Sequence, residues 1–269
     1  MLPVRFHITK DGSHSLYSET FGQYYHNPNG AIEESIHVFF NHSGLLEALQ
    51  EQRPISIFEM GFGTGLNLLL LLNFIKQFRY TSPITFESVE AWPIHPNQAL
   101  ELNHAGLIGD ASFGEVILTI FKQLHEGSQA IINIGNCAIT VHKCRFDALI
   151  PKNTPYTHFF HDAFSPEVNP DLWTPQVFKT LADRGTQDAV LVTYGASSAA
   201  RASMAVGGWK IARAPGALGK REMTVAGLSE NTVSKYSPLN TEKLINRWEK
   251  GDFAAQLVGN RINHPLQPG

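Results

Sequence analysis

The chain has 269 residues and a formal net charge of −3 at pH 7, and its 17% of charged residues excludes a disordered chain or a long coiled coil. Its two cysteines, Cys137 and Cys144, exclude a disulfide framework and indicate a reducing compartment, so we expect a cytoplasmic protein. The weak acidity argues against a protein held to nucleic acid mainly by bulk charge, but it leaves room for a local basic patch.

Apolar segments alternate with helical ones from about residue 44 to residue 230, a pattern typical of a wound α/β sheet. The predicted strands are Ile55–Met60, Ile84–Glu90, Tyr156–His161, Ala189–Tyr194 and Met223–Leu228, with a hairpin of Ile131–Ile134 and Ala138–Cys144 around Gly135-Asn136. The predicted helices are Leu66–Phe78, Ala111–His125, one that begins at Thr174-Pro175 and ends before Gly185, and Thr241–Lys250.

The predicted fold is therefore α/β, with a mostly parallel sheet and helices on both faces. Residues 1–43 are predicted to form an irregular, aromatic-rich N-terminal extension that packs on one main domain of residues 44–269. No apolar stretch approaches the ~18 residues of a membrane span, because Asn67 and Asn73 bracket the leucines of residues 68–72, so we expect no membrane partner.

A glycine-rich turn, Glu59-Met60-Gly61-Phe62-Gly63-Thr64-Gly65, lies between a predicted strand and a predicted helix. Glycines at such a turn let the backbone approach a ligand, and the helix N-terminus offers free N–H groups. The spacing is not that of a dinucleotide site, because Leu66 occupies the sixth position, and no Gly-Lys-Ser/Thr follows as in a P-loop. A tight strand–helix connection without a ligand is an equally open interpretation of the turn alone.

Acidic residues follow other predicted strands. Glu90 lies where a carboxylate accepts both hydroxyls of a ribose, and Asp147 is placed to accept from an adenine amino group. Because the carboxyl ends of neighbouring parallel strands line one crevice, we expect these two, Glu59 and Asp162 to converge. Four carboxylates favour a ligand with a ribose, an amine and a positive charge, such as S-adenosylmethionine, although any one of them could be a solvated loop acid.

Asp162 opens a segment in which Phe164 and Pro166 follow closely, similar to the acceptor-binding loop of amino-group methyltransferases. A carboxylate can orient an amine and take its proton, and an aromatic ring can pack on the approaching cation. Alignment of nitrogen, methyl group and sulfur would then supply most of the rate. Core packing is the alternative interpretation of Phe164.

Several segments together resemble the methyltransferase domain of the bacterial enzymes that complete 5-methylaminomethyl-2-thiouridine at the tRNA wobble position. The matching segments are residues 59–67 (EMGFGTGLN), 88–93 (SVEAWP), 162–173 (DAFSPEVNPDLW) and 219–223 (GKREM), and residues 25–35 (YHNPNGAIEES) resemble stand-alone members. The matches span most of residues 10–228, and the segment from Asp162 is much more specific than the glycine turn.

The resemblance implies a class I, Rossmann-like methyltransferase that uses S-adenosylmethionine to methylate the aminomethyl group of that uridine. It implies that Asp162 is the base or amine anchor and that Phe164 is its aromatic neighbour. The residues implied to hold the cofactor are Glu59, Gly61, Gly63, Gly65, Asn67, Glu90 and Asp147.

Bifunctional relatives carry a flavin-dependent oxidase domain in addition, which this sequence does not contain. We therefore expect the methylation step alone, with a separate enzyme supplying the aminomethyl precursor. Two alternatives stay open: a small-molecule amine N-methyltransferase, and a non-catalytic S-adenosylmethionine-binding accessory protein.

Basic residues gather near the end of the predicted sheet, at Lys210, Arg213, Lys220 and Arg221, with Arg201 upstream. We predict that Arg201, Lys220 and Arg221 contact tRNA phosphates, and solvated surface charges are an equal alternative.

Candidate metal ligands do not form a site of recognisable spacing. His158 and His161 are three apart on a predicted strand and so face opposite sides, and the pattern of Cys137, His142 and Cys144 lacks C-x-x-C spacing. We expect no metal.

Overall fold

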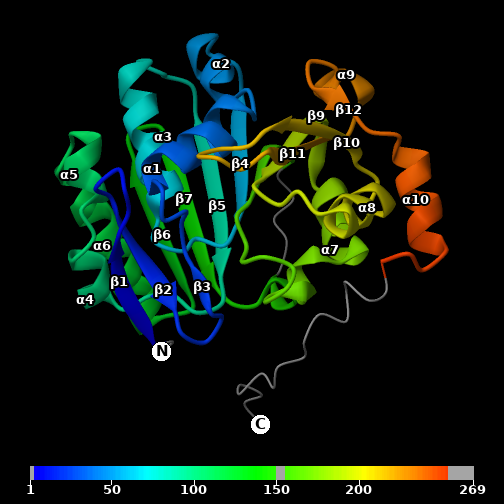
Figure 1. Ribbon diagram of the computed structural model, residues 1–269. Coiled ribbons are helices and arrows are strands. Elements are labelled where there is room, and N and C mark those ends of the chain that lie inside the picture. Colours follow the sequence, from blue (N-terminus) through cyan, green and yellow to red (C-terminus); the bar gives the residue numbers. More distant parts are fainter. Residues whose placement is uncertain (1–2, 150–154, 254–269) are drawn as a thin grey trace.

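The structure, a computed structural model, describes residues 3–149 and 155–253, so residues 254–269 of the predicted main domain lie outside the described residues. Its main sheet contains β4 (Ile55–Met60), β5 (Ile84–Glu90), β6 (Gln129–Ile134), β7 (Cys137–Lys143), β8 (Tyr156–His161), β9 (Gly185–Thr193), β10 (Lys210–Pro215), β11 (Glu222–Gly227) and β12 (Ser237–Pro238). The central strands run parallel in the order β9-β8-β4-β5-β7 (Figure 1). Antiparallel strands complete both edges, β6 beside β7 and β11-β10-β12 beside β9.

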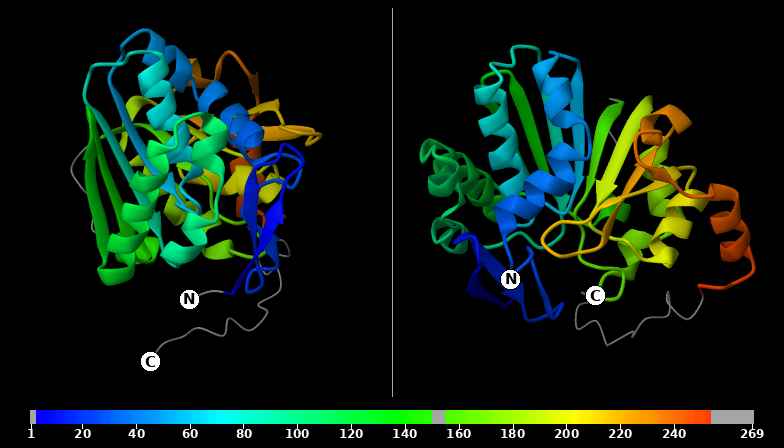
Figure 2. Two further views of the ribbon diagram at one scale, coloured as in Figure 1. Left: turned by 90° about the vertical axis from the view of Figure 1, so that its left-hand side faces the viewer. Right: turned by 45° about the horizontal axis from the view of Figure 1, so that its top comes forward.

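Helices cover both faces of this sheet, as predicted (Figures 1 and 2). One face carries α2 (Leu45–Gln50), α3 (Leu66–Gln77) and α6 (Ser112–Glu126), with α4 (Pro96–Leu100) and α5 (His104–Ile108) outside them. The other carries α7 (Pro175–Ala182) and α8 (Ser198–Val206), with α10 (Thr241–Glu249) against α8. Short helical segments are α9 (Glu230–Val233) and the 3-10 turns Phe146–Ala148 and Pro170–Trp173.

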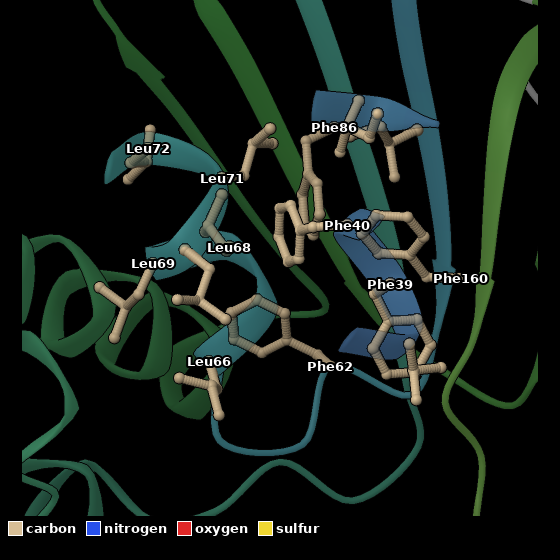
Figure 3. Close-up of a cluster of buried hydrophobic side chains, with 14 of the residues drawn as sticks. Phe39, Phe40, Phe62, Leu66, Leu68, Leu69, Leu71, Leu72, Phe86 and Phe160 are labelled. Atoms are coloured by element: carbon tan, nitrogen blue, oxygen red, sulfur yellow. The ribbon is translucent and has the colours of Figure 1, made fainter. Parts of the chain in front are cut away.

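Alternate residues of the central strands supply two hydrophobic cores, one on each face. Ile57 and Phe160 pack on the α3 side (Figure 3), whereas their neighbours Phe58 and Phe159 pack on the side of α7 and α8. Successive side chains of a strand point to opposite faces, so a strand buried on both sides has a continuous apolar sequence. This pattern is why the predicted strands at β4, β5 and β8 coincide with the observed ones.

Local residues set the start of the predicted helix α7 and the turn of the predicted hairpin. Thr174 Oγ1 accepts a hydrogen bond from the backbone N–H of Val177 (3.3 Å), and Pro175 occupies the first turn of α7. The predicted hairpin of β6 and β7 turns at Gly135, whose φ of 57° is left-handed.

The expectation that residues 1–43 are irregular is wrong. A three-stranded antiparallel sheet of β1 (Val4–Ile8), β2 (His14–Ser18) and β3 (Gln23–Tyr24) precedes α1 (Ala31–Ser35) and a π-helix (Ile36–Asn41). β1 alternates apolar and polar residues over only five positions, β2 carries polar residues on both faces and β3 has two residues, so the period-2 signal in the sequence is too short to stand out. Aromatic residues of the π-helix enter the main core, where the rings of Phe39 and Phe160 lie 5.2 Å apart (Figure 3).

Candidate active site

A cavity of about 340 Å³ lies at the carboxyl ends of β4, β5 and β8, where ligands bind in open α/β sheets. The turn after β4, the loops after β5 and β8, and residues 21–28 of the N-terminal region supply its walls. Among the predicted site residues, those that line the cavity are Gly61, Gly63, Asn67, Glu90, Asp147, Asp162, Phe164 and Lys220. Glu59 is 1% exposed and lies behind this wall, as does Gly65.

The glycines of the turn are required by backbone geometry. Gly61, Gly63 and Gly65 have φ values of 90°, 55° and 78°, which only glycine adopts at little cost. A Cβ on Gly61 would lie 2.8 Å from the backbone oxygen of Asp162, so the glycine lets the turn press against the end of β8. Gly65 instead packs against Ile117 of α6, and its role is to seat α3.

Glu59 and Asp162 are joined through Asn67 on the first turn of α3. Asn67 Nδ2 donates to Glu59 Oε1 (3.0 Å) and to Asp162 Oδ2 (3.1 Å), and Ser88 Oγ donates to Glu59 Oε2 (2.8 Å). Within the described residues, Asn67 Oδ1 is buried without a hydrogen-bond partner. The network therefore fixes both carboxyl groups, and one buried amide oxygen within it has no partner.

Burial raises the pKa of three carboxyl groups in this region, those of Glu59, Asp162 and Glu90. Desolvation raises the pKa of Glu59 to about 8 against the opposing hydrogen bonds from Ser88 and Asn67. Desolvation, and then the charge of Glu59, raises the pKa of Asp162 well above its usual value. The pKa of Glu90 is also raised by burial. A cavity with such carboxyl groups favours a cationic ligand, because a positive charge stabilises their ionised forms.

Glu90 at the end of β5 also shapes the turn. Its carboxylate accepts hydrogen bonds from the backbone N–H groups of Gly63 (3.0 Å) and Trp92 (2.9 Å). These bonds hold the glycine turn against the end of β5 and leave further lone pairs on the oxygens facing the cavity.

Asp147 lines the cavity from an exposed 3-10 turn, with 67% of its side chain accessible. Its carboxylate accepts hydrogen bonds from Arg145 at 3.1 Å and 3.2 Å, which lower the pKa of Asp147. It is thus an ionised rim residue, distinct from the buried acids.

Aromatic residues surround the position predicted for the acceptor. The ring centroid of Phe164 lies 4.8 Å from that of Phe21 and 5.1 Å from that of Tyr25. Tyr194 Oη donates to the backbone oxygen of Ala163 (2.7 Å), and Gln23 Nε2 contacts the same hydroxyl at 3.4 Å. The loop after β8 is therefore held from β9 and from the N-terminal sheet at once.

Sequence reasoning missed the N-terminal residues of this wall. Tyr25, His26 and Glu34 all line the cavity, and His26 Nε2 lies 3.2 Å from the hydroxyl of Thr64 in the glycine turn. Their signal was present, because all three fall in the segment 25–35 that resembles stand-alone members of the family.

The three predicted phosphate contacts lie in different environments. Lys220 reaches the cavity, where its Nζ pairs with Glu34 (2.8 Å) and lies 4.6 Å from the ring centroid of Tyr194. Arg221 is exposed and lies directly before β11.

The prediction of a phosphate contact by Arg201 is wrong. Its side chain is buried on α8 and donates to Thr224 Oγ1 (3.0 Å), Glu222 Oε2 (3.0 Å) and the Met223 backbone oxygen (3.1 Å). Its donors are committed to β11, so Arg201 holds the helix to the sheet.

Two observations concern a metal site and a membrane-spanning helix, neither of which the sequence predicts. In residues 3–149 and 155–253, no cluster of three or more His, Cys, Asp or Glu side chains is arranged to hold a metal ion. Across the same residues, no helix combines the length and apolar character that crossing a membrane demands.

Comparisons with known proteins agree with this geometry. Residues 111–229 match the model of a family described as S-adenosyl-L-methionine-dependent methyltransferase. The chain is 32% identical over 225 residues to the tRNA 5-methylaminomethyl-2-thiouridine biosynthesis bifunctional protein MnmC of Ralstonia nicotianae, covering 82% of this chain and 34% of that protein. The MnmC protein of Cupriavidus necator is 30% identical over 213 residues, which cover 78% of this chain and 32% of that protein.

The chain thus spans about a third of the length of these curated relatives. Among solved structures, MNMC2 from Aquifex aeolicus superposes with a TM-score of 0.69 at 25% identity, covering 91% of this chain and 81% of the other. Residues 111–229 thus match the S-adenosyl-L-methionine-dependent methyltransferase family, and most of the chain is similar to about a third of each MnmC protein and to MNMC2.

Proposed function

We propose that this chain transfers a methyl group from S-adenosylmethionine to the 5-aminomethyl group of the wobble uridine in tRNA. The observation that carries the proposal is the carboxylate of Asp162, fixed by Asn67 at the wall of the cavity and close in sequence to Phe164. The MnmC relatives act, by their names, in the biosynthesis of a methylaminomethyl nucleoside of tRNA.

The residues around the cavity fit the cofactor. The half-buried carboxyl groups of Glu90 and Asp162 line the cavity and favour positive charge. Gly61 and Gly63 leave the backbone of the turn open to the ligand. Glu59 does not reach the cavity, so we assign it an indirect part through Asn67 and Ser88.

S-adenosylmethionine supplies a methyl group on a positively charged sulfur. Asp162 accepts a hydrogen bond from the protonated amine, takes its proton and so frees the nitrogen lone pair. With the cofactor bound, that pair would attack the methyl carbon, the sulfur would leave with the electrons of the broken bond, and the proton would pass from Asp162 to solvent. Phe164 and its neighbours Phe21 and Tyr25 exclude water and pack on the cation.

The tRNA substrate would be held near the cavity by Lys220 and Arg221, each of which can contact a phosphate. A tRNA substrate places the enzyme in the cytoplasm, with a separate enzyme supplying the aminomethyl precursor.

Mass spectrometry of tRNA nucleosides from a strain that lacks this protein tests the proposal. We expect the unmethylated aminomethyl nucleoside to accumulate, and wild-type protein, but not Asp162→Asn, to restore the methylated form. An unchanged nucleoside profile would contradict a role in tRNA and leave methylation of a small amine, or cofactor binding without catalysis, as the function.

A further inference from the structure

A row of three aromatic side chains and one arginine, in contact with one another, crosses one face of the N-terminal sheet. We call Arg5, His7, Tyr17 and Tyr24 the aromatic platform. The strand register places Arg5 opposite Tyr17 and Tyr17 opposite Tyr24, so these side chains share one face. The guanidinium carbon of Arg5 lies 5.0 Å from the ring centroid of Tyr17. The ring centroids of Tyr17 and Tyr24 are 4.9 Å apart with the planes at 64°, and those of Tyr24 and His7 are 4.8 Å apart with the planes at 55°, so the rings meet edge to face or tilted.

The aromatic platform is open to solvent at both ends. Arg5 and Tyr24 are exposed, and His7 and Tyr17 are partly buried. Arg5 also pairs with Glu19 at 2.9 Å, which fixes the guanidinium over the ring of Tyr17. Aromatic side chains normally bury their rings in a core, whereas these pack against one another edge to face or tilted at the edge of the domain. The exposed ring of Tyr24 is the part of this row that suits a flat, π-bonded ligand.

The aromatic platform begins at the mouth of the cavity. Tyr24 lines the same cavity as Asp162, and the next residue, Tyr25, packs against Phe164 with ring centroids 5.1 Å apart. The views agree that β3 lies beside the end of β5 at which the cavity opens (Figures 1 and 2). A molecule that extends out of the cavity on this side must therefore pass over Tyr24.

We propose that the aromatic platform stacks nucleobases adjacent to the target nucleotide, and so binds single-stranded RNA next to the methylation site. This inference rests on the proposed function. A nucleotide drawn into a cavity loses the stacking of its neighbours, and aromatic rings and arginine planes replace that stacking in recognition of single-stranded RNA loops. The opposite face of β1 carries the exposed Phe6 and Ile8 instead.

The test uses an anticodon stem-loop RNA with 5-aminomethyluridine at the wobble position and 2-aminopurine, a base whose fluorescence is quenched by stacking, at a flanking position. With wild-type protein we expect methylation and quenching on binding. With Tyr24→Leu we expect quenching to be lost and KM for the RNA to rise about tenfold, as for the loss of one base stack. Tyr24→Phe keeps the ring and should retain both signals.

Phe6→Leu is the matched control, because Phe6 is 40% exposed, Tyr24 is 36% exposed, and the two lie on opposite faces of one sheet. It should leave quenching and KM unchanged. Cofactor binding and the melting temperature report folding, and His7→Ala provides a second variant should Tyr24→Leu unfold.

If wild-type protein methylates the RNA normally and Tyr24→Leu leaves quenching and KM unchanged, the proposed function stands and the role of the aromatic platform is overturned. Equal losses in Phe6→Leu would overturn it as well, as would a change of oligomeric state in Tyr24→Leu, which would show the face to be a protein interface. Failure of wild-type protein to methylate the RNA would instead contradict the proposed function, and quenching would then decide separately whether the platform binds RNA.

Discussion

Glu59 and Asp162 accept hydrogen bonds from the same side-chain nitrogen of Asn67, at 3.0 Å and 3.1 Å. The two carboxyl groups come from neighbouring strands and share one neutral donor, and burial raises the pKa of both. Their repulsion when both are ionised is relieved by a positive charge in the cavity. The pair therefore couples the binding of a cation to the loss of protons.

Affinity for S-adenosylmethionine should rise with pH between about 6 and 8 and level off above. A bound cation lowers the pKa values of Glu59 and Asp162, so binding releases protons wherever the free protein holds them. Calorimetric titrations in buffers of different ionisation enthalpy measure that release directly. Glu59→Gln should flatten the profile, and a flat profile in the wild type would contradict the coupling.

Stability of the ligand-free protein should fall as pH rises through the same range. The pKa of Glu59 is about 8 in the folded chain against an ordinary value of 4.5, so between these values the folded state binds more protons than the unfolded state. The free energy of unfolding then decreases with rising pH. Urea denaturation from pH 5 to pH 9 tests this decline, which Glu59→Gln should reduce; equal slopes in the two proteins would argue against an elevated pKa at Glu59.

Asp162→Asn should lower kcat by about 100-fold or more, the usual contribution of a positioned base, while the cofactor still binds. Glu167→Gln is the matched control, because Glu167 is an exposed acid on the same loop, and it should leave kcat near the wild-type value. Single-turnover methylation with a separate binding measurement gives both quantities. Full activity in Asp162→Asn would remove Asp162 from the chemistry.

Arg201→Ala should destabilise the fold by about 2 kcal/mol, because it deletes a buried side chain that donates to Glu222 and to the Met223 backbone oxygen of β11. Arg213→Ala, which removes a half-exposed side chain 3.6 Å from the same Glu222, should cost about 0.5 kcal/mol. Chemical denaturation compares the two. Similar losses would contradict a structural role specific to Arg201.

Lys220→Ala and Arg221→Ala should each reduce the slope of log affinity for tRNA against log salt by about 1, since each removes one phosphate contact. Lys220→Ala also frees Glu34 at the cavity mouth, so it should raise KM more than Arg221→Ala does. Filter binding between low and moderate salt measures the slopes. Slopes equal to that of the wild type would show that these charges face solvent only.

The sequence predicted the centre of the fold because its signals are local. Apolar runs buried on both faces identify β4, β5 and β8, and Thr174 with Pro175 marks the start of α7. The short strands of residues 4–24 lack such buried apolar runs, and the alternation of apolar and polar residues in β1 spans only five positions. Their position against the cavity is set by tertiary contacts such as that of Tyr25 with Phe164.

The sequence predicted which kinds of residue lie around the candidate site, but not how deeply each of them is buried. Acids at strand ends indicate a shared crevice, yet the sequence does not show that Glu59 lies behind Asn67 rather than in the cavity. For Arg201 the sequence did carry a sign of burial, because the residues around it on α8 are small and mostly apolar. The structure buries this whole stretch of the helix. A basic residue in such a helix is paired internally more readily than it reaches a phosphate.

The most direct test of the central claim is the mass of the wobble nucleoside after purified protein has acted on aminomethylated tRNA. With S-adenosylmethionine labelled in its methyl group, the account predicts one labelled methyl group on the aminomethyl nitrogen with the wild-type protein and almost none with Asp162→Asn. Absence of label with the wild-type protein, or equal label with Asp162→Asn, would contradict it.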